Sequence, residues 1–190
     1  MPEINLFEQS LRDITALLNN QKIDYMVIGG LANAKWGNPR ATLDIDITLW
    51  VEDQKIKSLL SLLDKNFTIR VEKPFEFISE TRVLPVMTRK NQHIDLIFGS
   101  LPFERNAIDR AVNVQVGKTP VSFCTAEDLI LLKIISDRPK DIDDVRGILR
   151  FQKEKLDYEY LEPRISELAS LLENPDIKEK WDKMKKETPA

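Results

Sequence analysis

The spacing of hydrophobic positions changes near residue 124, and this change divides the chain into two regions. Before that point, short apolar runs with strand-like spacing alternate with stretches of helical spacing. The segments expected as strands are residues 25–28, 42–51, 67–71, 83–88, 92–98, 112–116 and 121–123, with 83–88 and 92–98 forming a hairpin. Helices are expected over residues 3–20, 31–36, 74–81 and 102–111, and after a cap at Asp53.

After Cys124 only helical patterns occur. Thr125 and Asp128 form a capping-box variant that predicts one helix, and Pro139 is suited to begin the next. Further helical stripes cover residues 161–172 and 177–184. The sequence therefore predicts an α/β (α+β) fold, with a mixed β-sheet flanked by helices in residues 1–124 and a helical region, residues 125–190, packed on it.

The most informative stretch runs from residue 25 to residue 50. A first apolar run ends at Gly29-Gly30, and a second carries Asp44 and Asp46. Because side chains alternate along a strand, the two carboxylates share one face, where they repel each other unless a cation lies between them. Two simpler interpretations remain open. The glycines also suit a tight turn, and alternating Asp and Ile also suits the polar face of an edge strand.

Asp95 is a third aspartate inside an apolar strand, in the run His93-Ile-Asp-Leu-Ile. It could lie beside the first pair in a sheet, and three converging carboxylates suit two-metal phosphoryl transfer. His93 shares the face of Asp95, but a lone strand histidine is typical of a surface position and is given no role.

Lys133 interrupts a helix that is otherwise apolar nearly all round, so its amine must reach either solvent or a polar cleft. Asp141 and Asp144 follow at i, i+3 spacing on one helix face. A salt-bridged helix corner would explain these residues without any ligand. Arg40 and Thr42 lie in the link before Asp44, where an arginine would neutralise phosphate charge. A surface arginine is the alternative.

Composition narrows the chemistry. The chain has 190 residues and a net charge of −3, which argues against wholesale binding to nucleic acid but leaves room for a local basic groove. With one cysteine and one histidine, any bound metal must be held by carboxylates, which favours Mg²⁺ or Mn²⁺. The sequence has no signal peptide and no apolar run of membrane-spanning length, so a cytoplasmic location without a membrane partner is expected.

The glycine pair, a thirteen-residue spacer and Asp44-Ile45-Asp46 together resemble the signature of the DNA polymerase β-like nucleotidyltransferase superfamily. The run Pro39-Arg-Ala-Thr-Leu-Asp-Ile-Asp-Ile, with Leu132-Lys133 and Arg138-Pro-Lys-Asp, looks most like the AbiEii/MenT-type bacterial branch. That branch includes toxins of toxin–antitoxin systems. The resemblance covers residues 20–150 approximately.

The resemblance implies roles for individual residues. Gly29 and Gly30 would contact the nucleotide triphosphate, Asp44 and Asp46 would ligate Mg²⁺, and Asp95 would match the third carboxylate. The phosphate-contacting lysine of the branch would be Lys133, with Asp141 or Asp144 as the helical aspartate near it. Leu31 departs from the pattern, because many members carry serine or threonine after the glycine pair.

Three functions are therefore compared. The first is a Mg²⁺-dependent nucleotidyltransferase that moves a nucleoside monophosphate from an NTP to an acceptor hydroxyl on tRNA, a protein or a small molecule, with a possible antitoxin partner. The second is a nucleotide- or partner-binding module of the same fold, favoured by Leu31. The third, a metal-dependent nuclease, uses three aspartates but needs no NTP, and is ranked last.

Overall fold

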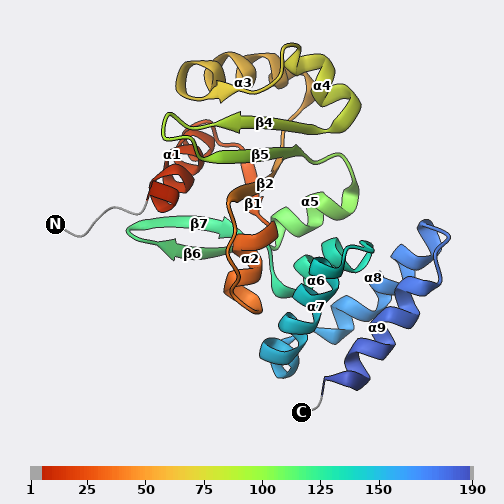
Figure 1. Cartoon of the computed structure of the whole chain (residues 1–190). Coiled ribbons are helices and arrows are strands. Elements are labelled where there is room, and N and C mark those ends of the chain that lie inside the picture. Colours follow the sequence, from red (N-terminus) through yellow and green to blue (C-terminus); the bar gives the residue numbers. More distant parts are fainter. Residues whose placement is uncertain (1–5, 189–190) are drawn as a thin grey trace. The chain divides into compact units, whose positions relative to one another are not determined.

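The chain forms two compact units in a computed structural model that describes residues 6–188 (Figure 1). Within the described residues, the first unit runs up to Leu31 and from Ala41 to Cys124. The second comprises Ala32–Arg40 and the residues after Cys124. The start of the predicted first helix, residues 3–5, lies outside the described residues.

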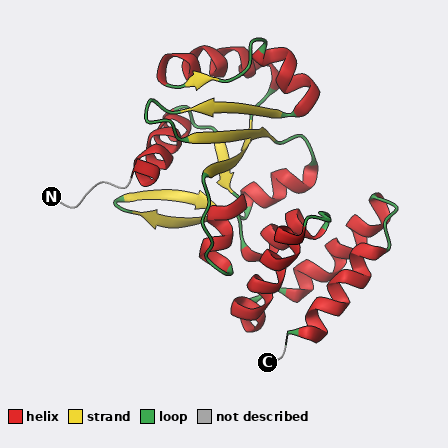
Figure 2. Ribbon diagram, in the orientation of Figure 1, coloured by secondary structure: helices red, strands yellow, loops and turns green. Residues whose placement is uncertain are grey.

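All strands of the described residues belong to the first unit, where they form one mixed sheet (Figure 2). Its strand order is β3-β4-β5-β2-β1-β7-β6. Pairing is parallel for β1–β7 and β2–β5 and antiparallel for the other neighbours. The strands are β1 (Asp24–Val27), β2 (Asp44–Trp50), β3 (Thr68–Ile69), β4 (Val83–Met87), β5 (His93–Phe98), β6 (Val112–Val116) and β7 (Thr119–Phe123). The predicted mixed α/β fold is confirmed, as is the hairpin of β4 and β5.

Strand β2 lies in the middle of this sheet, between β1 and β5. Its apolar positions Ile45, Ile47 and Leu49 have no exposed surface, so one face of the strand is fully in the core. The edge-strand interpretation of the Asp-Ile alternation is therefore wrong. Aspartates are disfavoured in a central strand, so folding stability does not account for Asp44 and Asp46 at these positions.

Helices of the first unit pack against the sheet at different strands. They are α1 (Leu6–Asn20), which contacts β1 and β7; α3 (Asp53–Asn66); α4 (Pro74–Thr81), which contacts β4; and α5 (Pro102–Asp109), which contacts β1 and β2. The predicted cap at Asp53 is wrong, because Asp53 is the first helical residue and Glu52 takes the cap position without a side-chain hydrogen bond. The predicted strand over 67–71 shortens to two residues.

Helix α2 (Gly29–Trp36) begins directly after β1, two residues earlier than predicted. The division into units falls inside this helix, after Leu31. Its first turn therefore belongs to the first unit and its last turn to the second. A single continuous helix is thus shared by both.

The second unit is helical, as its periodicity predicts (Figure 2). Thr125 caps the first of its helices by accepting a hydrogen bond from the Asp128 backbone N–H. Its helices after that cap are α6 (Ala126–Ile134), α7 (Pro139–Gln152), the short 3₁₀ turn η1 (Lys153–Lys155), α8 (Tyr158–Leu171) and α9 (Asp176–Glu187). Helix α6 packs against α7, α8 and α9, and Trp181 of α9 is buried in this core. Among the described helices, none is long and apolar enough to cross a membrane.

Candidate active site

Three aspartates meet on two neighbouring parallel strands of the first unit. Asp44 and Asp46 lie two residues apart on β2, and Asp46 is directly opposite Asp95 on β5. Partners in a sheet point to the same face, and so do residues two apart, so the three carboxylates share one face. Asp44 is exposed, whereas Asp46 and Asp95 are half-buried. The prediction that Asp95 lies beside the pair is confirmed.

The pKa of Asp95 reflects both its burial and the charge of a neighbouring carboxylate. Burial raises the pKa of Asp95 above its ordinary value of 3.8, the negative charge of Asp44 raises it further, and His93 opposes the rise. A carboxylate whose ionised form is disfavoured by burial and by a like charge is stabilised by a nearby cation. The arrangement therefore favours the binding of positive charge on this face.

Two features require a glycine at position 29: the backbone conformation there and the close approach of Asp46. Its φ is +64°, and a Cβ placed on it would lie 1.9 Å from Oδ2 of Asp46. That distance is far below contact, so no side chain larger than hydrogen fits while the Asp46 carboxylate keeps its position. The helix glycine and the strand aspartate are thus coupled by direct contact. The tight-turn interpretation explains the positive φ but not this close approach.

Gly30 makes a similar close approach to the link before β2. A Cβ placed on it would lie 2.5 Å from Oγ1 of Thr42, whose hydroxyl donates to the Asp44 carbonyl at 3.2 Å. Residues Gly29 and Gly30 are the first two of α2, where backbone N–H groups lack helical acceptors and suit an anion. Their predicted contact with a triphosphate stays a prediction.

The carboxylate face suits a divalent cation in its donor chemistry. Within residues 6–188, no three His, Cys, Asp or Glu side chains lie close enough to enclose a metal ion by themselves. Mg²⁺, however, is usually held by one or two carboxylates together with substrate phosphates, rather than by an all-protein cage. Asp44 and Asp46, with Asp95 alongside, supply hard oxygen ligands of that kind.

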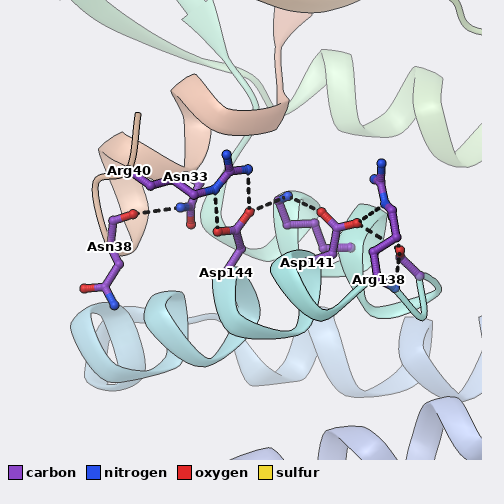
Figure 3. A network of polar contacts seen from close by, with 8 residues as sticks. Asn33, Asn38, Arg40, Arg138, Asp141 and Asp144 are labelled. Atoms are coloured by element: carbon purple, nitrogen blue, oxygen red, sulfur yellow. Dashed lines mark hydrogen bonds and ion pairs between the residues drawn. The ribbon is translucent and has the colours of Figure 1, made fainter. Parts of the chain in front are cut away.

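A second polar cluster lies in the second unit, around Lys133 on α6. The Lys133 amine is 2.8 Å from Oδ1 of Asp141 and 2.7 Å from Oδ2 of Asp144 (Figure 3). Its side chain is 8% exposed, so the alternative of snorkelling to solvent is wrong. The two aspartates, one turn apart on α7, hold the amine between them. The salt-bridged corner that the i, i+3 spacing suggested is what the structure contains.

Asp144 also holds Arg40. The Arg40 guanidinium donates two hydrogen bonds to Asp144, from Nε to Oδ1 and from Nη2 to Oδ2, both at 3.1 Å (Figure 3). This arrangement is bidentate. Asp144 therefore joins the end of the 32–40 segment to α6 and α7 within the second unit. The Arg40 side chain is 36% exposed.

Several partners stabilise the ionised form of Asp141. Burial alone would raise its pKa, but hydrogen bonds from Lys133 and Ser136 and the charges of Lys133 and Arg138 outweigh burial, so the pKa lies below 3.8. Arg138 reaches its Oδ2 at 2.6 Å. Asp141 is thus ionised in the fold at any ordinary pH.

Two polar residues of the second unit had escaped the sequence interpretation. Asn33 is fully buried and donates to the Asn38 carbonyl at 2.8 Å, which fixes the loop after α2 (Figure 3). Ser136 donates to Oδ2 of Asp141 at 2.9 Å. The signal for Asn33 is its position in the middle of a short apolar helix. Ser136 lies in the link between α6 and α7, where a serine gives no such signal.

The family comparison places the chain among the nucleotidyltransferases, whose fold its mixed sheet shares. More specifically, it belongs to the family of nucleotidyltransferases of unknown function DUF6036, which residues 6–188 match. None of the curated proteins matches the sequence.

Solved structures of nucleotidyltransferases have a similar fold at low identity. The adenylyltransferase ANT(2'')-Ia, crystallised with adenylyl-2''-tobramycin, has a TM-score of 0.59 and 14% identity, over 88% of this chain and 99% of the other. The lincosamide antibiotic adenylyltransferase LnuA, bound to lincomycin, has a TM-score of 0.53 and 16% identity, over 74% of this chain and 95% of the other. An antigenic nucleotidyltransferase-like protein from Paracoccidioides brasiliensis has a TM-score of 0.56 and 16% identity, over 92% of this chain and 91% of the other.

Proposed function

We propose that the chain transfers a nucleoside monophosphate from an NTP to an acceptor hydroxyl, with Asp44, Asp46 and Asp95 as the reacting centre. The single observation that carries this proposal is the placement of Asp46 opposite Asp95 on parallel strands, with Gly29 in contact with the Asp46 carboxylate. Aspartates are disfavoured in a central strand, and a bound cation would stabilise three carboxylates that share one face.

In the proposed reaction, the acceptor oxygen attacks the α-phosphorus of the NTP. A new P–O bond forms, the bond to the β-phosphate oxygen breaks, and pyrophosphate leaves. Asp44 and Asp46 would hold a divalent cation, Mg²⁺ or Mn²⁺, which supplies charge neutralisation at the phosphates. Asp95 orients the attacking hydroxyl and takes its proton. The N–H groups at the start of α2 face phosphate oxygens in this proposal.

The roles that the family resemblance gives to Lys133, Asp141 and Asp144 in nucleotide binding stay predictions. Lys133 is fully engaged with two carboxylates, which supports a structural role for it within the second unit. The role of Arg40 in phosphate neutralisation, which its place in the link before Asp44 suggests, likewise stays a prediction.

The acceptor class is open to a direct comparison. Two structural neighbours were solved with lincomycin and with adenylyl-2''-tobramycin, so lincomycin and tobramycin offer small-molecule acceptors to test. The AbiEii/MenT resemblance points instead to tRNA and a partner antitoxin, and a protein side chain is the third class. A labelled protein acceptor would be detected on SDS gels and labelled RNA on denaturing gels. A labelled small molecule would be detected by chromatography.

The test is incubation of the full chain with Mg²⁺ and α-³²P-labelled NTPs in the presence of each acceptor class. We expect label transfer by the parent chain and none by Asp44→Asn or Asp46→Asn. Asp64→Asn, at an exposed position of α3, is the matched control and should transfer as the parent does. Transfer by the Asp46 variant at the parental rate would refute the assignment.

The alternative function is a nucleotide-binding module without transfer, and Leu31 is the observation that favours it. Leu31 follows the glycine pair inside α2 and supplies no hydroxyl to a phosphate. Calorimetry separates the two functions, since a module binds Mg²⁺·NTP but yields no labelled product with any acceptor.

A further inference from the structure

A groove in the first unit runs along α3 and is lined by more basic than acidic side chains. It consists of two cavities of about 630 Å³ and 530 Å³ that adjoin at Gln21 and Leu62. The first cavity follows α3 from Glu52 to Lys65, and the second continues to Phe67. Helix α3 has 14 residues, which at 1.5 Å each gives the groove a length of about 20 Å. We call it the α3 groove.

The charges of the α3 groove are unusual for an acidic chain with a net charge of −3. Its acidic residues are Asp13, Asp24 and Glu52. Its basic residues are twice as many, namely Lys22, Lys55, Lys65, Arg89, Lys90 and Arg105. The basic excess is therefore local and sits in a concave site.

Four of these basic residues are not neutralised. Arg105 is paired with Asp24 at 2.9 Å, and Lys55 with Glu52 at 3.1 Å. Within the described residues, no carboxylate pairs with the other four, Lys22, Lys65, Arg89 and Lys90. Lys90 donates to the neutral amide of Gln9, and Arg89 to the Lys65 carbonyl at 3.4 Å. These four charges are available to an anionic ligand.

The shape and the walls of the groove select among anions. An elongated groove with charges along its length suits an extended polyanion better than a single compact anion. At one end, half-buried Trp50 forms part of the wall, with the Arg105 guanidinium 5.9 Å from its ring centroid. A basic track with an aromatic and guanidinium surface is the arrangement that holds a nucleic-acid backbone and its bases.

We propose that the α3 groove binds a single-stranded nucleic-acid segment. The site is separate from the carboxylates, because none of Asp44, Asp46 and Asp95 lines it. Trp50 ends β2 and Asp44 begins it, so the Trp50 end of the groove is about 20 Å from Asp44 along the strand. Binding in the groove therefore does not depend on transfer activity.

The test is fluorescence anisotropy of the full chain with a fluorescein-labelled single-stranded RNA 12-mer. We expect binding by the parent chain, with a plot of log affinity against log salt sloping by about −3 if four phosphates are neutralised. The variant Lys22→Glu/Lys65→Glu/Lys90→Glu should bind at least tenfold more weakly. Trp50→Leu should lose about tenfold through lost stacking.

The matched control is Lys57→Glu/Lys73→Glu/Lys118→Glu, which changes the net charge equally at exposed positions outside the groove. It should bind within twofold of the parent chain. Both triple variants are checked for parental circular dichroism and thermal unfolding, and Asp44→Asn/Asp46→Asn should retain full RNA binding.

Three outcomes would overturn the proposal: no binding by the parent chain, equal loss in both triple variants, or equal competition by polyglutamate at the same charge concentration. The last outcome would assign the groove to acidic protein segments instead. Absence of label transfer by the parent chain, together with RNA binding by that chain, would refute the proposed function and leave the groove assignment intact.

Discussion

At the scale of single residues, Gly29 is the position where sequence and geometry agree most closely. Its positive φ and the 1.9 Å separation that a Cβ there would have from Asp46 make two separate demands on the same residue. Only the second demand concerns the carboxylate site. A pair of glycine substitutions can therefore separate the conformational effect from the chemical one.

Gly29→Ala is expected to destabilise the chain by about 1–3 kcal/mol, because alanine is strained at positive φ. It should also abolish label transfer, because its methyl group displaces the Asp46 carboxylate. Gly117→Ala is the matched control: its φ is +61°, but its nearest neighbour is the flexible end of Glu8. Urea unfolding should give similar losses for both variants, and transfer should fail only in the first. Equal activity in the two would contradict the role of the close approach.

Asp141 gives stability a dependence on pH that can be measured. Its pKa is lower in the fold than in the unfolded chain, so its contribution is present above the unfolded value of about 3.8. The contribution is lost as pH falls through the lower folded pKa. Asp141→Asn should therefore be less stable than the parent chain at pH 7, and the difference should shrink as the pH is lowered below 3.8. A difference that stays constant as the pH falls from neutral to below the folded pKa would exclude ionised Asp141 as its cause.

At the scale of helices and strands, the sequence predicted most elements because their apolar stripes are regular. Strand β2 and its Asp95-bearing neighbour were expected from alternation alone, and the structure pairs them in parallel. The order of strands was not accessible, because alternation says which face is buried but not which strand is the neighbour. The edge-strand interpretation of Asp44 and Asp46 failed for that reason.

The polar corner of α6 and α7 was harder to anticipate. Spacing placed Asp141 and Asp144 on one face, but nothing local shows that this face is buried against Lys133. Buried carboxylates and a buried amine stabilise each other only as a complete set. Their arrangement is therefore decided by tertiary packing and not by helix periodicity.

Lys133→Met is expected to destabilise the chain by about 3–5 kcal/mol, because it leaves two buried carboxylates without their shared cation. Arg138→Met is the control on the same cluster; its side chain is 67% exposed, so its loss should cost about 1 kcal/mol or less. Denaturant unfolding at neutral pH gives both values. A small effect at Lys133 would mean that Arg138 and Arg40, which also contact the two aspartates, or uptake of protons compensate for the lost amine.

At the scale of the whole molecule, the chain passes between the two units more than once. It leaves the first unit after Leu31, returns at Ala41, and leaves again after Cys124. Because α2 starts at Gly29 in the first unit and ends at Trp36 in the second, unfolding of the second unit removes part of a helix whose first turn faces Asp46. This connectivity predicts that the units unfold as one cooperative system, although the ligand is proposed to bind the first.

Mg²⁺·ATP at about one hundred times its dissociation constant should stabilise the chain by about 2.7 kcal/mol. For a chain of this length, that corresponds to a rise in Tm of about 5–10 °C. Two single-tryptophan variants report on the units separately: Trp50 belongs to the first, and buried Trp181 to the second. Both reporters should shift equally on ligand addition, and neither should shift in Asp44→Asn/Asp46→Asn. A shift confined to Trp50 would show that the shared helix does not couple the units, because the second unit would then unfold at its own temperature whatever the carboxylates bind.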